Sequence, residues 1–209
     1  MHPEAITSKQ REILKDLLIP PQFYLVGGTA LALQIGHRVS VDFDFFVHAK
    51  KLPEKLVVQV ENKLSGRKIE VLLQRDYQFT FRVEGVEATY FAYPFKPLFP
   101  FVRYGKIPML SVREIALSKA HTIGRRAAFK DYVDLYFILK ENHITLENIL
   151  KLAKKKYGDE FDARLFLEQL VYLEDILPMN ITFLNKRVSK SQLQTFFEAQ
   201  IRTIKIESA

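Results

Sequence analysis

The chain has 209 residues, with 31 Lys and Arg against 24 Asp and Glu, so its formal net charge is +7. It contains no Cys, which excludes a disulfide scaffold, a zinc site built on thiolates and Cys-based redox chemistry. Hydrophobic residues make up 48% of the sequence, and no apolar run reaches the roughly 18 residues that span a membrane. We therefore expect a cytoplasmic globular protein without a membrane partner, whose positive charge is compatible with a polyanionic partner.

The first 92 residues predict an alternation of helices and strands. Thr7 and Gln10 form a capping-box pattern that opens a helix over residues 7–18, which two prolines end. Glu84 and Gly85 predict a hairpin turn between two strands. The other elements expected here are strands over 23–26, 41–47, 68–73, 78–83 and 86–92, a helix over 29–35 capped by Gly36, and a helix over 53–64.

Residues 93–110 contain five prolines and glycines that break any helix, so we expect an irregular connection that packs its aromatic rings. After this connection the sequence predicts amphipathic helices, over residues 111–123, 130–140, 145–157, 160–176 and 189–204. The sequence thus predicts an α+β fold in two parts. A mixed sheet with flanking helices occupies residues 1–110, and a helical region occupies residues 111–209.

Two features of the first part carry chemistry when they are taken together. Gly27 and Gly28 open a helix, whose first N–H groups and positive dipole end can bind phosphate, and Thr29 adds a hydroxyl group. Asp42 and Asp44 alternate along a strand, so both carboxylates project from one face, roughly 6–7 Å apart along the chain. Such a pair suits Mg²⁺, which takes one or two carboxylates together with phosphate oxygens. The combination favours phosphoryl or nucleotidyl transfer.

The segment from Phe23 to Val47 resembles the first motif of the nucleotidyltransferase AbiEii/AbiGii toxin family, within the DNA polymerase β-like nucleotidyltransferase superfamily. The positions that match are Gly27, Gly28, Thr29, Gly36, His37, Arg38, Ser40, Asp42 and Asp44. The resemblance implies a polymerase β-like nucleotidyltransferase fold in which Asp42 and Asp44 are catalytic ligands of Mg²⁺, or of Mn²⁺ in its place. It also implies a nucleotide-binding set made of Gly27, Gly28, Thr29, Arg38 and Ser40.

A second stretch resembles the same family. The pattern is a helical Lys, an Arg seven residues later, and a basic-Asp pair that leads into Tyr-x-Asp-Leu, filled here by Lys119, Arg126, Lys130, Asp131 and Asp134. The resemblance implies that Lys119 and Asp131 belong to the catalytic site. It further implies that Arg126 and Lys130 bind nucleotide phosphates. Asp131 is also placed to cap the following helix and to orient Lys119 or Lys130. Asp134 is expected in a structural ion pair.

One position departs from the family pattern. The family places a third carboxylate on a later strand, and here Thr89 occupies that position. A neutral Thr cannot act as a base at pH 7, so the chain lacks a group that would complete the metal site or take the proton of the attacking hydroxyl. Glu87, two residues earlier on the same strand face, is one candidate replacement, and a solvated surface role for it is at least as compatible with the sequence.

The resemblance implies a toxin-like, metal-dependent nucleotidyltransferase. Such an enzyme would move a nucleoside monophosphate from a nucleoside triphosphate to an RNA, such as tRNA, or to a protein hydroxyl, and an antitoxin would hold it in check. Two alternatives stay open. In the first, the chain is a degenerate member that binds nucleotides without turnover. In the second, it is an enzyme that modifies a small molecule such as an antibiotic. In the last case residues 145–204 would help to form the acceptor pocket.

Overall fold

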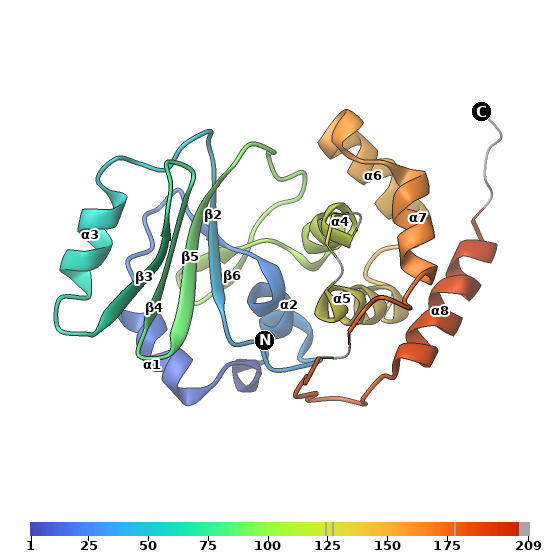
Figure 1. The fold of residues 1–209 in the computed structure, drawn as a ribbon, viewed down its shortest axis with the longest axis horizontal. Helices are drawn as coiled ribbons and strands as arrows, with labels where there is room; N and C mark the ends of the chain where they lie inside the picture. Colours follow the sequence, from blue (N-terminus) through green and yellow to red (C-terminus); the bar gives the residue numbers. More distant parts are fainter. Residues whose placement is uncertain (124, 127, 178, 205–209) are drawn as a thin grey trace. The chain divides into compact units, whose positions relative to one another are not determined.

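The computed structural model describes residues 1–123, 125–126, 128–177 and 179–204 of the chain (Figure 1). The chain divides into two compact units, Met1–Ser111 and Val112–Ala209. The first unit is built on a sheet with accompanying helices, and the second is built of helices. Within the described ranges, no helix is long and apolar enough to cross a membrane.

The first unit contains a mixed sheet of seven described strands. In the order in which they lie side by side, they are β3 (Ile69–Gln74), β4 (Gln78–Val83), β5 (Val86–Tyr93), β2 (Phe43–His48), β1 (Tyr24–Leu25), β7 (Ile107–Met109) and β6 (Val102–Tyr104). β2 runs parallel to β5 and β1 runs parallel to β7, whereas the other neighbouring pairs are antiparallel. The parallel pairing of β2 with β5 puts Asp44 beside Thr89.

The two faces of this sheet differ in burial. Aromatic side chains at alternate positions line one face and are 0% exposed, namely Phe43, Phe45, Phe79, Phe81 and Tyr90. Their neighbouring rings lie with centroids 5.0–6.2 Å apart, at the spacing of favourable aromatic pairs. Successive strand residues point to opposite faces, so Asp44, Thr80 and Thr89 lie on the other face. The sheet therefore has buried aromatic rings on one face and a row of polar side chains, the polar row, on the other.

Three α-helices accompany the sheet: α1 (Ser8–Asp16), α2 (Gly27–Ile35) and α3 (Leu56–Lys63), together with the 3₁₀ helix η1 (Pro3–Ala5). The capping box predicted for α1 is confirmed, because Gln10 N donates to Thr7 Oγ1 at 3.1 Å and Thr7 N donates to Gln10 Oε1 at 2.9 Å. α2 ends at Gly36, whose φ of 63° is a left-handed conformation that glycine adopts without steric penalty. The predicted C-cap is therefore also confirmed.

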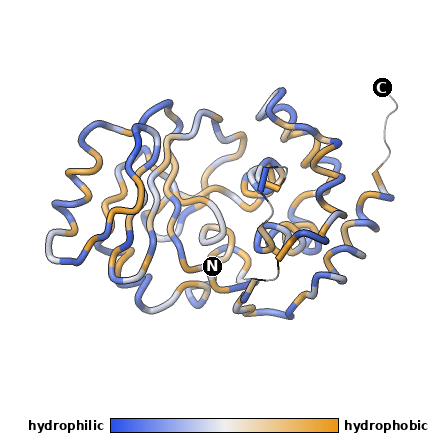
Figure 2. The backbone as a smooth tube through the Cα atoms, viewed as in Figure 1, coloured by the Kyte–Doolittle hydropathy of each residue, from blue (hydrophilic) through white to orange (hydrophobic). Residues whose placement is uncertain are grey.

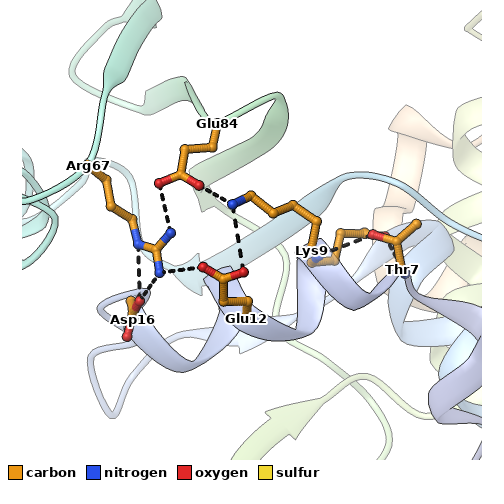
Figure 3. Close-up of polar contacts among 7 residues, drawn as sticks. Thr7, Lys9, Glu12, Asp16, Arg67 and Glu84 are labelled. Carbon is orange, nitrogen blue, oxygen red and sulfur yellow. Dashed lines mark hydrogen bonds and ion pairs between the residues drawn. The ribbon is translucent and has the colours of Figure 1, made fainter.

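A charged cluster links α1 to the segment before β3 and to the turn after β4 (Figure 3). Arg67 donates to Glu84 at 2.8 Å, to Glu12 at 3.0 Å and to Asp16 at 2.5 Å. Lys9 also forms an ion pair with Glu84. Hydrogen bonds from Lys9 and Arg67 lower the pKa of Glu84. These side chains are partly solvated, so each pair stabilises the unit only modestly.

The second unit consists of α4 (Val112–Ile123), α5 (Phe129–Lys140), α6 (Leu146–Tyr157), α7 (Ala163–Val171) and α8 (Lys190–Arg202), with the 3₁₀ helix η2 (Gly158–Glu160) after α6. Nearly every residue of α5 is buried, so this helix forms the centre of the unit. Apolar and polar residues alternate along α6, α7 and α8 (Figure 2), as expected of helices that bury one side only. Thr145 and Ser189 cap α6 and α8 with their side chains.

The predicted α+β fold class is confirmed, and the differences from the sequence-based elements are local. The irregular connection expected over residues 93–110 is wrong in part, because its end forms the hairpin of β6 and β7 around Gly105, whose φ is 59°. The helix expected over 160–176 extends only over Ala163–Val171. Gly27 and Gly28 are the first residues of α2 rather than a turn before it.

Candidate functional site

The candidate site begins where β1 passes into α2, beside β2. Leu25 of β1 pairs with Phe45 of β2, and one residue further Val26 N donates to Asp44 O at 2.9 Å. Val26 is the N-cap residue of α2, and no described side chain forms a hydrogen bond that caps this helix. The amino end of α2, with its N–H groups and positive dipole end, therefore lies directly beside the Asp44 backbone.

Gly27 lies close to the Asp44 carboxylate. Its φ of 67° lies in the left-handed region that favours glycine. A Cβ atom at this position would lie 2.9 Å from Asp44 Oδ2, which real Cβ contacts essentially never show. A side chain at residue 27 would therefore push the carboxylate away, and glycine is required both for the backbone conformation and for the contact.

Gly28 is in close contact with a buried polar group. A Cβ atom here would lie 2.4 Å from a guanidinium nitrogen of Arg38 and 3.2 Å from Ser40 Oγ. Thr29 Oγ1 donates to Ser40 Oγ at 2.9 Å and also contacts the backbone oxygen of Asp42. Arg38 and Ser40 are only 5% and 7% exposed. Gly28, Thr29, Arg38 and Ser40 of the first motif thus come together in one polar cluster at the start of α2.

Asp42 lies just before β2 and Asp44 lies within it, and both side chains are half-buried. Thr89 on β5, at the position where the family pattern expects a third carboxylate, pairs directly with Asp44 on β2. Thr89 Oγ1 is hydrogen-bonded to Thr80 Oγ1 on β4 at 3.1 Å. A hydroxyl pair therefore occupies the place beside Asp44 where an acid was expected.

Glu87 lies one side-chain repeat before Thr89 on the same face of β5 and forms an ion pair with Arg82 of β4 at 3.4 Å. The hypothesis that Glu87 replaces the third acid gains no support from this pairing. Thr80 and Arg82 were not predicted to lie on this face. The alternation in Gln-Phe-Thr-Phe-Arg-Val does indicate their common face, but only the β4–β5 register shows which residues they meet.

The donor set fits a hard cation that nucleotide phosphates would help to bind. No three His, Cys, Asp or Glu side chains of the described chain gather closely enough to hold a metal ion by themselves. Asp42 and Asp44 supply carboxylate oxygens, which suit Mg²⁺ or Mn²⁺ when phosphate and water oxygens complete the coordination. The contact between Gly27 and Asp44 also puts the amino end of a helix, which is suited to anions, beside a carboxylate, which is suited to cations.

In the second unit, Lys119 lies between two buried carboxylates. Lys119 Nζ is 2.6 Å from Asp131 Oδ1 and 2.5 Å from Asp134 Oδ2, and both Asp side chains are 0% exposed. Arg126 Nε approaches Asp131 Oδ2 at 3.1 Å from a side chain that is 60% exposed. The four groups carry two positive and two negative charges, so this cluster is electrically neutral. Lys119 is consequently a buried paired cation that links α4 to α5.

Other residues of the second motif differ from expectation in part. The suggestion that Asp131 caps α5 is wrong, because Ala128 is the N-cap residue and no side-chain cap is formed. The expected orientation of Lys119 by Asp131 is present as the ion pair described above. Asp134 forms the structural ion pair expected of it. Lys130 is half-buried at the start of α5.

A buried charged pair in the same unit was not anticipated. Glu114 on α4 and Lys156 on α6 meet at 2.5 Å, with side chains 0% and 2% exposed. Burial lowers the pKa of Lys156, and the Glu114 carboxylate opposes that shift. The two residues are 42 positions apart, so no local pattern predicts their contact. Such a pair fixes the register of α4 against α6.

Comparison with known proteins agrees with this geometry. The sequence model of the family described as nucleotidyl transferase AbiEii toxin, type IV TA system, matches residues 12–97 and 85–206. The uncharacterized protein aq_aa25 of Aquifex aeolicus (strain VF5) is 32% identical over 176 residues, which cover 81% of this chain and 84% of that protein.

Several solved structures share the fold at low sequence identity. MenT4, a nucleotidyltransferase toxin of Mycobacterium tuberculosis H37Rv, has a TM-score of 0.59 at 19% identity, covering 89% of this chain and 77% of that chain. A candidate nucleotidyltransferase from H. pylori has a TM-score of 0.56 at 20% identity, covering 96% and 93%. JHP933 from Helicobacter pylori has a TM-score of 0.54 at 18% identity, covering 96% and 90%.

The two motifs read from the sequence and the mixed sheet that carries the first of them agree with these matches. The family model extends over nearly the whole chain, and the relative from Aquifex aeolicus matches most of it. The chain belongs to the AbiEii nucleotidyltransferase toxin family.

Proposed function

We propose that this protein is a metal-dependent nucleotidyltransferase that transfers a nucleoside monophosphate from a nucleoside triphosphate to a hydroxyl group of an RNA. The observation that carries the proposal is the contact between the amino end of α2 and Asp44, where a Gly27 Cβ atom would lie 2.9 Å from the carboxylate. A triphosphate needs amide donors for its oxygens and a cation to offset its charge. The amino end of α2 offers the amide donors, and Asp44 offers a carboxylate ligand for the cation.

The proposed reaction uses the amino end of α2 and the carboxylates of Asp42 and Asp44. The N–H groups at the start of α2 bind phosphate oxygens, and glycine at residues 27 and 28 lets these oxygens approach the backbone. Asp42 and Asp44 would hold Mg²⁺ or Mn²⁺, which when bound neutralises charge on the phosphates. The acceptor hydroxyl oxygen attacks the α-phosphorus, the bond from that phosphorus to the pyrophosphate oxygen breaks, and the hydroxyl proton leaves to solvent.

The second-motif residues enter the proposal through the family pattern alone. Arg126 is the most exposed cation of that motif and Lys130 is half-buried, so both suit phosphate binding by charge. The charge of Lys119 is offset by Asp131 and Asp134. We assign Lys119 and Asp131 to the positioning of α4 against α5.

The test is incorporation of labelled nucleotide. Purified protein would be incubated with Mg²⁺ and each labelled nucleoside triphosphate, with cellular RNA, cellular protein or a panel of small hydroxyl compounds as acceptor. We expect label in RNA, and a loss of at least 100-fold in Asp42→Asn and Asp44→Asn, because each change removes a charged ligand. Asp76→Asn is the matched control, since Asp76 is an exposed carboxylate that pairs with Lys51.

The acceptor arms separate the competing classes of substrate. Label in protein alone or in a small molecule alone would overturn the assignment to RNA while leaving the reaction type intact. Equal incorporation by wild type and by Asp44→Asn would overturn the reaction site itself.

A second candidate function rests on one observation. The Thr80–Thr89 hydroxyl pair occupies the place of the third acid beside Asp44, which favours a protein that binds nucleotides without turnover. That candidate predicts nucleoside triphosphate binding by calorimetry with no incorporation. It also predicts a gain of incorporation in Thr89→Asp, with Thr80→Asp as the control on the neighbouring strand.

The family is described as part of a type IV toxin–antitoxin system. We therefore propose that an antitoxin protein limits the toxicity of this chain in its host cell. Expression of the chain alone should slow growth, and co-expression of a neighbouring small reading frame should restore it. Normal growth in the absence of any second gene would contradict this part of the proposal.

A further inference from the structure

The polar row around Asp44 continues into an aromatic row along the same two strands. The parallel register that pairs Asp44 with Thr89 pairs Phe46 with Phe91 two residues later. Alternate strand residues share a face, so these rings lie on the face of Asp44, roughly 7 Å further along. His48 pairs with Tyr93 at the next repeat. The polar row and the rings thus lie on one face of the sheet.

The rings on this face form a connected series. Phe46 and Phe91 have centroids 5.2 Å apart, and Phe46 and Tyr93 have centroids 5.0 Å apart. Tyr77, in the turn before β4, meets Phe91 at 5.8 Å, and Phe95, after β5, meets Tyr93 at 5.4 Å. We refer to these five residues, Phe46, Tyr77, Phe91, Tyr93 and Phe95, as the aromatic platform.

Burial distinguishes the aromatic platform from the core of the same sheet. The rings on the opposite face, such as Phe45, Phe79 and Phe81, are all 0% exposed. In the platform, Tyr77 is 45% exposed and the other four rings are half-buried. Rings that served only to fill the core would be expected to be covered as completely as those of the other face.

The loops next to the aromatic platform carry positive charge. Lys50 and Lys51 follow β2, and Lys96 follows the platform residue Phe95. Asp76, next to Tyr77, pairs with Lys51 at 3.0 Å, so three cations and one acid border the rings. Partly exposed rings beside a cationic border are the arrangement with which proteins bind single-stranded nucleic acid, because bases stack on rings and phosphates attract cations.

We infer that the aromatic platform binds the unpaired end of an RNA acceptor by stacking its bases, with the terminal hydroxyl group directed to Asp42 and Asp44. The inference rests on the proposed function and names the acceptor as single-stranded RNA. A donor nucleotide presents one base, which one ring can stack, whereas five rings in series match successive bases of a strand.

The experiment measures binding in EDTA, so that it does not depend on turnover. A fluorescein-labelled 12-nucleotide single-stranded RNA and an abasic oligomer of equal length and charge would be titrated with full-length protein and followed by anisotropy. We expect the RNA to bind at least tenfold more tightly than the abasic oligomer. Phe91→Leu should weaken RNA binding about tenfold and leave abasic binding unchanged, because it removes a ring while keeping an apolar side chain.

Two further variants guard against a folding defect. Tyr77→Leu changes the most exposed ring of the platform and should weaken RNA binding about fivefold with an unchanged melting temperature. Tyr172→Leu is the matched control, because Tyr172 is also an exposed tyrosine, at 48%, and lies outside the platform. It should bind RNA as the wild type does.

Three results would overturn the inference. Equal affinity of the wild type for RNA and for the abasic oligomer would mean that only phosphates are bound. Unchanged RNA affinity in both platform variants would place the bases elsewhere. Weaker binding of a free nucleoside triphosphate with unchanged RNA binding would assign the rings to the donor base. Asp44→Asn should keep RNA binding in EDTA, so a failure of catalysis is distinguishable from a failure of the platform.

Discussion

At the scale of single residues, Gly27 connects the backbone to the site chemistry. Its φ of 67° and its contact with Asp44 both exclude a side chain. Gly28 is constrained differently, because it has no positive φ and its contact is with the guanidinium of Arg38, the far end of a flexible side chain. Adjacent glycines thus differ in how easily the surroundings accommodate a methyl group.

We expect Gly27→Ala to lower the free energy of unfolding by about 1–2 kcal/mol, because a non-glycine residue in the left-handed region is disfavoured by that amount. Nucleotide incorporation should fall by more than the stability change explains, since the added methyl group displaces the Asp44 carboxylate. Denaturant unfolding and the incorporation assay together would measure both effects. Gly66→Ala is the control, because a Cβ atom there has no neighbour within 4 Å.

The part of the candidate site whose residues lie close together in the sequence was predictable. The Gly-Gly-Thr and Asp-x-Asp motifs lie within 18 residues, and the structure brings Gly27 into contact with Asp44. The sequence indicated that Asp131 orients Lys119 and that Asp134 forms an ion pair, but it did not show that one lysine is shared by both carboxylates. Only the packing of α4 against α5 determines which groups share a buried space.

At the scale of elements, local signals identified helices better than strands. The capping box at Thr7 and the C-cap at Gly36 depend on residues within one helical turn, so the sequence contains all of the relevant information. The hairpin of β6 and β7 was missed because Pro108 lies inside it and because β7 gains its place by pairing with β1, about 84 residues earlier. Such long-range pairing has no signature in a local window.

The contact between α4 and α6 introduces a pH-dependent element. The His121 ring stacks on the Tyr157 ring with centroids 4.0 Å apart and planes 12° apart. Burial, together with the nearby charges of Arg125 and Lys156, lowers the pKa of His121 to about 4, and the Glu160 carboxylate opposes this shift. The ordinary pKa near 6.5 applies in the unfolded chain, so the unfolded state binds more protons between these values. Stability therefore falls as pH decreases from about 6.5 to about 4.

We expect His121→Phe to keep the stacked ring and to remove this proton uptake. The variant should lose less stability than the wild type between pH 6.5 and pH 4, as measured by thermal unfolding over that range. His143→Phe is the control, because His143 is partly exposed and pairs with Glu141. If the wild type and His121→Phe lose stability equally over this range, the histidine does not supply the pH dependence.

At the scale of the whole molecule, the net charge of +7 is spread over the sequence. Residues 1–109 hold 15 basic and 11 acidic residues, and residues 110–209 hold 16 and 13. The excess of positive charge is therefore not concentrated in a basic tail. Positive surfaces form only where a stretch of the sequence lacks acidic residues, which we call a gap. The stretch 88–111 is one such gap in the first unit, with three cations and no acid. Its charge is expected to act on a polyanion that touches β5.

Salt dependence tests this distribution of charge. The logarithm of RNA affinity should fall linearly with the logarithm of salt concentration, with a slope of about −0.7 for each phosphate neutralised on a single strand. Lys96→Gln should reduce the size of the slope by about 0.7. Lys63→Gln, at the end of α3, should leave it unchanged. An identical slope in all three proteins would show that Lys96 contacts no phosphate.

The pairing of β2 with β5 also bears on the order in which this protein folds. Asp44 and Thr89 lie about 45 residues apart in the chain and meet only through parallel strands, which need a long crossover. Closing so large a loop is entropically unfavourable until the β3–β4–β5 antiparallel strands have formed a surface to receive β2. We therefore expect the site to assemble late. A newly synthesised chain would form its helices and hairpins before it forms the geometry proposed for activity. The chain would therefore become toxic only after this last folding step, and not as soon as it is synthesised.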